Sequence, residues 1–288
     1  YTNKLSSQPI SIDDCTVICN GEIYNWTSLH EQIRVPNTTG SDCEIIIHMY
    51  KRFGIEETLL QLDGVFAFAL HDSTRTKTYI ARDPYGVRPL FQGCVENSNV
   101  YASELKMLCL SDTLVSNIRQ FPPGHFKCVE DDSCQRYFYP SFSKCDGSYE
   151  DAKALVRCAL MNAVRKRVKN TERQIGCLLS GGLDSSLISA LVSSEKNEPI
   201  HTWSIGMPKS PDLYHASIVS KHLNSYHHCI ELKEEDFINA LPEVIQTIES
   251  YDVTTVRASV GNWLIGKHIK QMSEQKVIFN GDGADEVC

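Results

Sequence analysis

The segment Ile175–Ser186 constrains the fold more than any other part of the sequence. It reads Ile-Gly-Cys-Leu-Leu-Ser-Gly-Gly-Leu-Asp-Ser-Ser, so an apolar stretch leads through a Ser-Gly-Gly turn into a helix that we expect to begin at Ser185. Gly181 and Gly182 would let the backbone approach a ligand closely, and the free N–H groups at a helix start attract anions. The pattern predicts a phosphate site, with a capped structural turn as the alternative.

Polar side chains around this turn suit a nucleotide. The hydroxyls of Ser180, Ser185 and Ser186 could donate to phosphate oxygens. Asp184 would repel a bare phosphate, but it fits if Mg²⁺ bridges the carboxylate to a pyrophosphate. The string lacks both the Gly-Lys-Ser/Thr of a Walker loop and the spacing of a dinucleotide fingerprint. We therefore expect a phosphate-binding loop of another type, with Mg²⁺ as the bridging ion.

Strands and helices are predicted to alternate through the second half of the chain. The pattern of apolar runs predicts strands over 174–179, 200–206, 226–232 and 276–279, with helices over 185–193 and 212–223 between them. Such an order is typical of a doubly wound parallel sheet in an α/β domain, here residues 148–288. Ser148 and Asp151 predict a capping box for a first helix, whose apolar face would comprise Leu155, Val156, Ala159, Leu160, Ala163 and Val164.

The first half of the chain is mostly β. Strands are expected at 16–19, before an Asn20-Gly21 turn, and at 65–70 and 78–81. Two helices interrupt them: Thr27 is predicted to cap one that runs through Ile33, and Asp42 one whose apolar stripe holds Ile46, Ile47 and Tyr50. The mixture predicts a layered α+β domain of the αββα type over residues 1–140, joined to the second domain by a polar stretch.

Composition narrows the class of protein. With 36 acidic and 28 basic residues the formal net charge is −8, which argues against a nucleic-acid partner. No apolar run approaches the roughly 20 residues of a membrane span. The 12 cysteines are scattered without C-x-x-C pairs, which favours reduced thiols and a cytoplasmic protein.

The Ser180–Ser186 string resembles the pyrophosphate loop of the ATP pyrophosphatases, and segments 204–213, 248–259 and 279–286 resemble the asparagine synthetase family. The resemblance implies that Asp184 and Asp285 hold Mg²⁺, that Arg257 meets developing negative charge, and that Asp282 helps to form the acyl adenylate. It also implies an ATP site made by Leu178, Ser180, Gly181, Gly182, Asp184, Ser185, Ser186, Ile205, Asn280 and Gly281. Two positions depart from the family pattern, because Asn280 replaces a serine and Asp282 replaces a glutamate.

The segments 19–25 and 40–44, followed in family order by 62–69, 82–90 and 101–106, resemble the class II glutamine amidotransferases. The resemblance implies that Asn20 and Gly21 form an oxyanion hole and that Glu22 and Asp42 bind the α-ammonium group of glutamine. Such enzymes use an N-terminal cysteine, which Tyr1 cannot replace, and Cys19 is expected to be a buried strand residue. We therefore expect an internal fragment that lacks both ends of the enzyme.

Together these features predict an enzyme that makes asparagine from aspartate, ATP and glutamine through aspartyl-AMP, releasing AMP, pyrophosphate and glutamate. Two alternatives stay open: a paralogue that acts on another carboxylate, and a truncated, non-catalytic nucleotide-binding protein. The unbroken segment Tyr251–Ser259 favours aspartate as the acceptor. Partners would be small molecules rather than nucleic acid or membrane, and a homodimer is an assembly that the resemblance allows.

Overall fold

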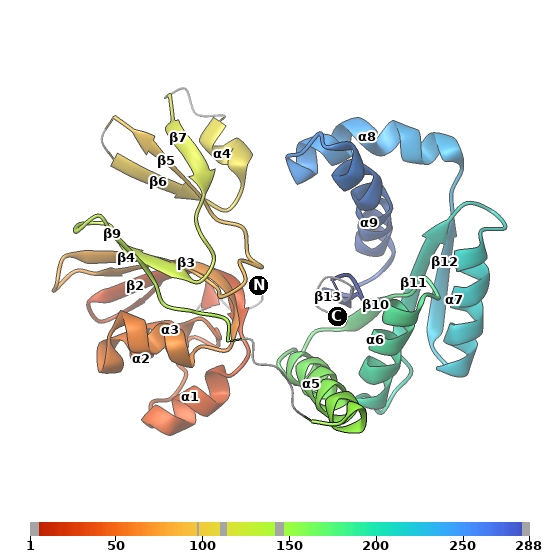
Figure 1. Ribbon diagram of the computed structural model, residues 1–288, viewed down its shortest axis with the longest axis horizontal. Coiled ribbons are helices and arrows are strands. Elements are labelled where there is room, and N and C mark those ends of the chain that lie inside the picture. The colour runs from red at the N-terminus through yellow and green to blue at the C-terminus, as the bar shows by residue number, and fades with distance from the viewer. Residues whose placement is uncertain (1–5, 97, 110–113, 142–146, 284–288) are drawn as a thin grey trace. The chain divides into compact units, whose positions relative to one another are not determined.

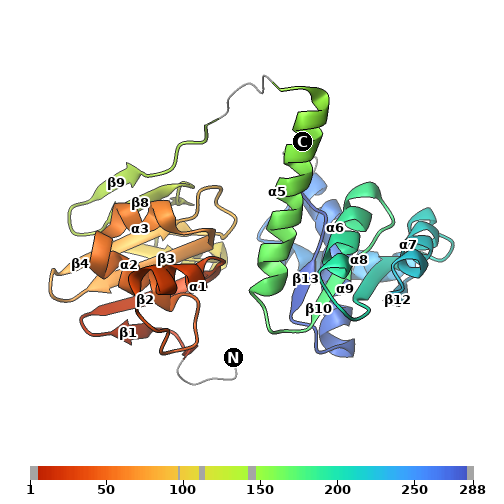
Figure 2. The same cartoon turned by 90° about the horizontal axis from the view of Figure 1, so that it is seen from below.

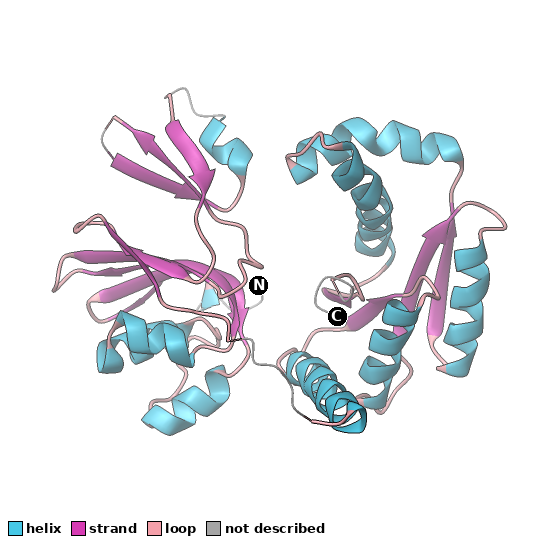
Figure 3. Cartoon of the chain, viewed as in Figure 1, coloured by secondary structure: helices cyan, strands magenta, loops and turns pink. Residues whose placement is uncertain are grey.

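The computed structural model describes residues 6–96, 98–109, 114–141 and 147–283. The chain divides into two units, residues 1–144 and 145–288, each with its own sheet and helices (Figures 1 and 3). In the part of the chain described, no helix is long and apolar enough to cross a membrane.

An antiparallel sheet forms the centre of the first unit. Its strand order is β1 (Ile10–Ile12), β2 (Cys15–Ile23), β3 (Gly64–Asp72), β4 (Lys77–Arg82), β8 (His125–Cys128) and β9 (Ser133–Arg136). Side chains alternate along β3, so that Phe66, Phe68 and Leu70 reach one face and Ala67 and Ala69 the other. The first face packs against helices α1 (Trp26–Ile33), α2 (Glu44–Phe53) and α3 (Ile55–Gln61), as Figure 2 shows.

A smaller sheet covers the opposite face. It consists of β6 (Ser98–Ala102), β5 (Phe91–Val95) and β7 (Ser116–Gln120), in that order, and the short helix α4 (Leu105–Cys109) lies against β6. Ala67 and Ile80 of the large sheet pack with Leu90, Tyr101 and Phe121 between the two sheets. This helix–sheet–sheet arrangement is the layered fold that the sequence predicts.

The prediction of a turn at Asn20–Gly21 is wrong. Both residues lie inside β2, opposite Ala67 and Phe66 of β3. A Cβ on Gly21 would lie 2.3 Å from the carbonyl oxygen of Val65. The glycine is therefore needed for close strand pairing, and tertiary pairing overrides the turn preference of an Asn-Gly pair.

Two of the predicted helix caps are also wrong. Thr27 lies within α1, whose N-cap is Asn25, and α2 has Cys43 rather than Asp42 at its N-cap. The Asp42 carboxylate instead accepts a hydrogen bond from the backbone N–H of Ile23 at 2.7 Å. The predicted apolar stripe of α2 is confirmed, because Ile46, Ile47 and Tyr50 are all buried.

A parallel sheet forms the centre of the second unit. Its order is β12 (Tyr226–Glu231), β11 (His201–Gly206), β10 (Ile175–Leu178) and β13 (Val277–Phe279). Helices α5 (Tyr149–Lys169) and α6 (Leu183–Ser194) pack on one face through Val164, Val192 and Cys177. Helix α9 (Val253–Met272) packs on the other face and contacts α8 (Glu234–Ile248), as Figure 1 shows. The predicted doubly wound sheet is therefore present.

Helix α5 begins as predicted, but fewer of its apolar side chains are buried than predicted. Ser148 and Asp151 form the capping box, with the Ser148 hydroxyl accepting from the Asp151 N–H. Of the predicted apolar face only Val164 is buried, whereas Leu155 is 64% exposed and Val156 is 59% exposed. Helical periodicity identified the helix, but it could not show how much of that face has a partner.

Candidate functional site

Two loops of the second unit meet at the carboxyl ends of neighbouring strands. The chain leaves β10 toward β11 and β12 on one side, whereas β13 pairs with β10 on the other side. The order of strands therefore reverses between β10 and β13, and ligands of open α/β sheets bind at such a switch point. The loop of Ser180–Gly182 follows β10, and the loop of Asn280–Asp282 follows β13.

Glycines allow these loops to approach closely. A Cβ on Gly281 would lie 2.7 Å from the carbonyl carbon of Asp184 and 2.7 Å from the nitrogen of Ser185, so this loop contacts the start of α6. Gly181 has φ +83°, and a Cβ there would lie 2.5 Å from the backbone nitrogen of Ala216 in α7 (Pro211–His222). Neither position has room for a side chain.

The start of α6 carries backbone N–H groups and hydroxyls together. Helix α6 begins at Leu183 with Gly182 as its N-cap, two residues earlier than predicted, so Asp184 and Ser185 lie in its first turn. The Ser180 and Ser185 hydroxyls are 2.9 Å apart, and the Ser185 hydroxyl accepts from the Ser180 N–H at 3.2 Å. The Ser186 hydroxyl is buried and has no hydrogen-bond partner among the described residues. This is a loop that offers hydroxyl and N–H donors at a helix N-terminus.

The carboxylates predicted to hold Mg²⁺ are only partly within the described residues. Asp184 is half-buried in the first turn of α6, next to Gly281, whereas Asp285 lies outside the described residues. Within the described ranges there is no cluster of three metal-ligating side chains. A carboxylate beside a loop of hydroxyl and N–H donors fits a Mg²⁺ that takes its remaining ligands from phosphate and water.

Asp282 lies in a small group of amides and a carboxylate that sequence reasoning only partly found. Its Oδ2 accepts a hydrogen bond from Asn280 Nδ2 at 3.1 Å and another from Asn262 Nδ2 at 3.2 Å. Asn262 belongs to α9, and no motif singled it out. Only the packing of α9 against the sheet brings it to Asp282, 20 positions later in the sequence.

A pocket of about 530 Å³ extends from these amides along α9. Its lining includes the predicted residues Leu178 and Asn280, together with Asn262 and the apolar side chains of Ile265 and Ile278. Such a mixture of apolar walls and a few polar groups is typical of small-molecule sites. The predicted adenine contact Ile205 does not line this pocket and packs with residues of α8, α9 and β12.

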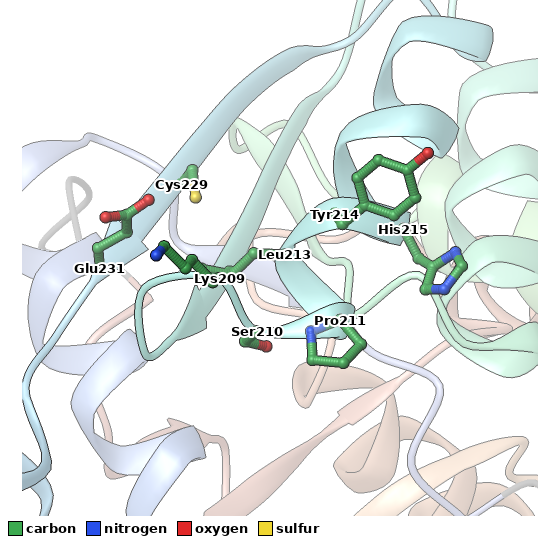
Figure 4. A pocket seen from close by; sticks show the side chains of 8 residues that line it. All are labelled: Lys209, Ser210, Pro211, Leu213, Tyr214, His215, Cys229 and Glu231. Carbon is green, nitrogen blue, oxygen red and sulfur yellow. The ribbon is translucent and has the colours of Figure 1, made fainter.

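Arg257 and a second pocket lie apart from these contacts. Arg257 is exposed in the first turns of α9. The N-cap of this helix is Asp252, whose carboxylate accepts a hydrogen bond from the Thr255 N–H at 2.8 Å. The second pocket, of about 540 Å³, lies between the start of α7 and β12, and Figure 4 shows its side chains. No sequence-predicted site residue lines it; its residues are Lys209, Ser210, Pro211, Leu213, Tyr214, His215, Cys229 and Glu231.

The residues predicted to bind glutamine lie in the first unit. Asn20, Gly21 and Glu22 follow one another in the last part of β2, and the hydrogen bond from Ile23 to Asp42 draws the loop before α2 to the same strand end. Burial raises the pKa of Asp42 above its ordinary value. A cationic group would stabilise the charged form of such a carboxylate. Cys19 is a buried residue of β2, as predicted.

Comparison with known proteins gives two family matches and a set of relatives. Residues 2–113 match the profile of a glutamine amidotransferase domain, and residues 155–288 match that of asparagine synthase. Glutamine-hydrolysing asparagine synthetase from Gallus gallus is 41% identical over 93% of this chain and 53% of its own length. The corresponding enzyme from Homo sapiens is 40% identical with the same coverage. The chain thus spans about half the length of these curated relatives.

Solved structures give more distant likenesses. Glutamine phosphoribosylpyrophosphate amidotransferase from B. subtilis, complexed with ADP and GMP, has a TM-score of 0.44 and 15% identity, covering 98% of this chain and 75% of its own. An NH3-dependent NAD synthetase from Campylobacter jejuni has a TM-score of 0.35 and 17% identity, covering 46% of this chain and 58% of its own. Similarity at this level carries no inference about activity.

Proposed function

We propose that this chain belongs to the family of the glutamine-hydrolysing asparagine synthetases, to which it is about 40% identical, and that it supplies parts of both half-sites of that enzyme. The overall reaction would convert aspartate, ATP and glutamine into asparagine, AMP, pyrophosphate and glutamate. The observation that carries this proposal is the contact of the Gly281 loop with the start of α6, which unites the two nucleotide motifs at the switch point of the sheet.

The second unit would activate aspartate. An oxygen of the aspartate side-chain carboxylate attacks the α-phosphorus of ATP, and the bond to the bridging oxygen breaks to release pyrophosphate. The Ser180–Gly182 loop and the N–H groups of α6 would bind the phosphates, while Leu178, Asn280 and Gly281 would face the nucleoside. Ammonia then attacks the acyl carbon of aspartyl-AMP, and AMP leaves.

Charged groups would act around that reaction. Arg257 would offset negative charge as it develops on the acyl phosphate, and Asp282, held by two amides, would assist formation of the adenylate. Asp184, with Asp285, would hold Mg²⁺, which supplies charge neutralisation of the phosphates when bound.

The first unit would release ammonia from glutamine. The Asn20 amide and the Gly21 N–H would stabilise the oxyanion of the tetrahedral intermediate. Glu22 and Asp42 would bind the α-ammonium group through charge-assisted hydrogen bonds. The raised pKa of the half-buried Asp42 supports this role, because a bound ammonium group would supply the counter-charge that its carboxylate lacks. A cytoplasmic location and a homodimer remain predictions from the sequence.

Exchange of labelled pyrophosphate into ATP tests the nucleotide half of the proposal. The full-length protein should catalyse this exchange only when aspartate is present. Asp184→Asn should abolish it, while the matched surface change Glu198→Gln should leave it unchanged. If exchange proceeds with another carboxylic acid but not with aspartate, the acceptor substrate is that acid and not aspartate. If no carboxylic acid supports exchange, the proposed adenylation activity is contradicted.

A further inference from the structure

Glu44 is a fully buried carboxylate for which the proposed reaction has no role. Its side chain is 0% exposed at the first turn of α2. Glu44 Oε1 accepts from the Thr38 N–H at 2.9 Å, and Glu44 Oε2 accepts from the Thr39 N–H and the Thr39 hydroxyl, both at 2.6 Å. The Thr38 hydroxyl and His48 Nε2 lie 3.1 Å from Oε1. A buried carboxylate that accepts so many hydrogen bonds fixes the position of the chain segment that donates them.

The donors belong to the loop that ends in Asp42. Within the same loop the Gly40 N–H donates to Asn37 Oδ1 at 2.6 Å, and Asn37 Nδ2 donates to the Ser41 carbonyl at 2.8 Å. The Ser41 N–H donates to the Thr39 hydroxyl at 3.2 Å, so the bonds run without a break from Glu44 to the residue before Asp42. This segment, residues 37–42, is called the glutamine loop below.

Glu44 stays ionised in this setting. Burial by itself would raise the pKa of Glu44, but the Thr39 hydroxyl, the N–H groups of Thr38 and Thr39 and the bond to His48 outweigh it and lower the pKa to about 2. His48 is the basic side chain that pairs with it. A negative charge at the start of α2 also interacts favourably with the helix dipole.

We propose that Glu44 is a positioning residue for glutamine: its buried carboxylate folds the glutamine loop so that Asp42 is held against the Ile23 N–H at the end of β2, the strand that also carries Glu22. The inference rests on the proposed function of that site. Glu44 does not touch the substrate in this account. It fixes the separation of the two carboxylates that receive the α-ammonium group, and it therefore governs glutamine affinity rather than the chemistry at the synthetase site.

Steady-state kinetics of the full-length protein test this inference, with glutamate release from glutamine as one readout and asparagine formed from ammonium as the other. Glu44→Gln keeps the size of the side chain but presents an NH₂ group to N–H donors. It should raise the KM for glutamine about ten- to a hundred-fold, the usual effect of losing charge-assisted hydrogen bonds. Ammonium-dependent synthesis should stay within about two-fold of the parent protein.

Two further variants keep the test sharp if Glu44→Gln folds poorly. Thr39→Val removes one hydroxyl donor but leaves the N–H, so it should raise the KM for glutamine less than Glu44→Gln does. Glu44→Asp keeps the charge and should recover part of the affinity. The exposed Glu31 of α1 provides the matched control, because Glu31→Gln should change neither readout.

The outcomes separate the inference from the function on which it rests. A raised glutamine KM in Glu44→Gln and Thr39→Val with intact ammonium-dependent synthesis supports the positioning role. An unchanged KM in Thr39→Val and in folded Glu44→Gln overturns it, as does an equal loss of both activities. If the parent hydrolyses glutamine but makes no asparagine, the synthetase function fails while glutamate release still decides the role of Glu44. If the parent protein hydrolyses no glutamine, both the positioning role of Glu44 and the proposed glutamine-dependent function are overturned.

Discussion

Replacing Gly281 by alanine tests whether the two nucleotide loops pack as described. The added methyl group would lie 2.7 Å from the Asp184 carbonyl carbon, 2.7 Å from the Ser185 nitrogen and 3.0 Å from the Asp184 Cβ. Two of these three atoms are backbone atoms in the first turn of α6, and they cannot move aside as a flexible side chain can. The loop after β13 would therefore have to shift away from α6.

Overpacking of this kind costs about 1–3 kcal/mol. We expect urea denaturation to show that the free energy of unfolding of the second unit falls by that amount. A shift of the loop would also separate the groups that we propose to bind the nucleotide, so the Kd for ATP should rise about ten-fold or more, which corresponds to ~1.4 kcal/mol. Circular dichroism in urea and fluorescence titration with ATP would measure the two effects.

Gly261→Ala is the matched control. Gly261 lies within α9, and a Cβ there would meet nothing within 4 Å. Alanine should stabilise this helix by roughly 0.5–1 kcal/mol relative to glycine and leave ATP affinity unchanged. If Gly281→Ala lowered neither the free energy of unfolding nor the affinity for ATP, the close contact between the loop after β13 and the start of α6 would be refuted. The two nucleotide motifs would then not form one site.

Two other predictions concern one carboxylate in each unit, Asp282 in the second and Glu44 in the first. Asn262→Ala removes one of the two amide donors to Asp282, so aspartate-dependent pyrophosphate exchange should fall about three- to ten-fold; an unchanged rate would show that Asn280 alone positions Asp282. The pKa of Glu44 is lowered from 4.5 to about 2, so its ionised form stabilises the first unit above pH 4.5, and that contribution is lost as the pH falls toward 2. In urea denaturation, the free energy of unfolding of Glu44→Gln should be roughly 3 kcal/mol lower than that of the parent protein at pH 7. This difference should shrink below pH 4.5. A difference that does not depend on pH would contradict an ionised Glu44 carboxylate.

Local patterns predicted most of the second unit because its strands and helices carry strong apolar runs and clear turns. The predicted strand at 200–206 matches β11 to within one residue, and the predicted helix at 212–223 matches α7 equally well. The parallel order of strands followed from their alternation with helices, since parallel strands need a crossover between them.

The errors arose where distant segments decide local structure. Asn20 and Gly21 form a strand because β3 pairs along their whole length. Asp42 is drawn away from the helix start by the Ile23 N–H of β2. Neither partner could be read from the sequence around these residues.

The same reason explains the residues that were missed. Asn262 and Glu44 belong to helices whose periodicity describes only their apolar faces. Asn262 meets Asp282 only after α9 packs on the sheet, and Glu44 gains its hydrogen bonds only when residues 38 and 39 fold over it. Polar partners of this kind are set by the fold rather than by local spacing.

The most direct test of the account uses the full-length protein with ATP, Mg²⁺, aspartate and glutamine labelled with ¹⁵N at its amide. The account predicts asparagine that carries the label in its side-chain amide, with AMP formed in equal amount. An Asp184→Ala variant should make no asparagine from either glutamine or ammonium while it still hydrolyses glutamine. Failure of the parent protein to make asparagine from both nitrogen donors would contradict the proposed function.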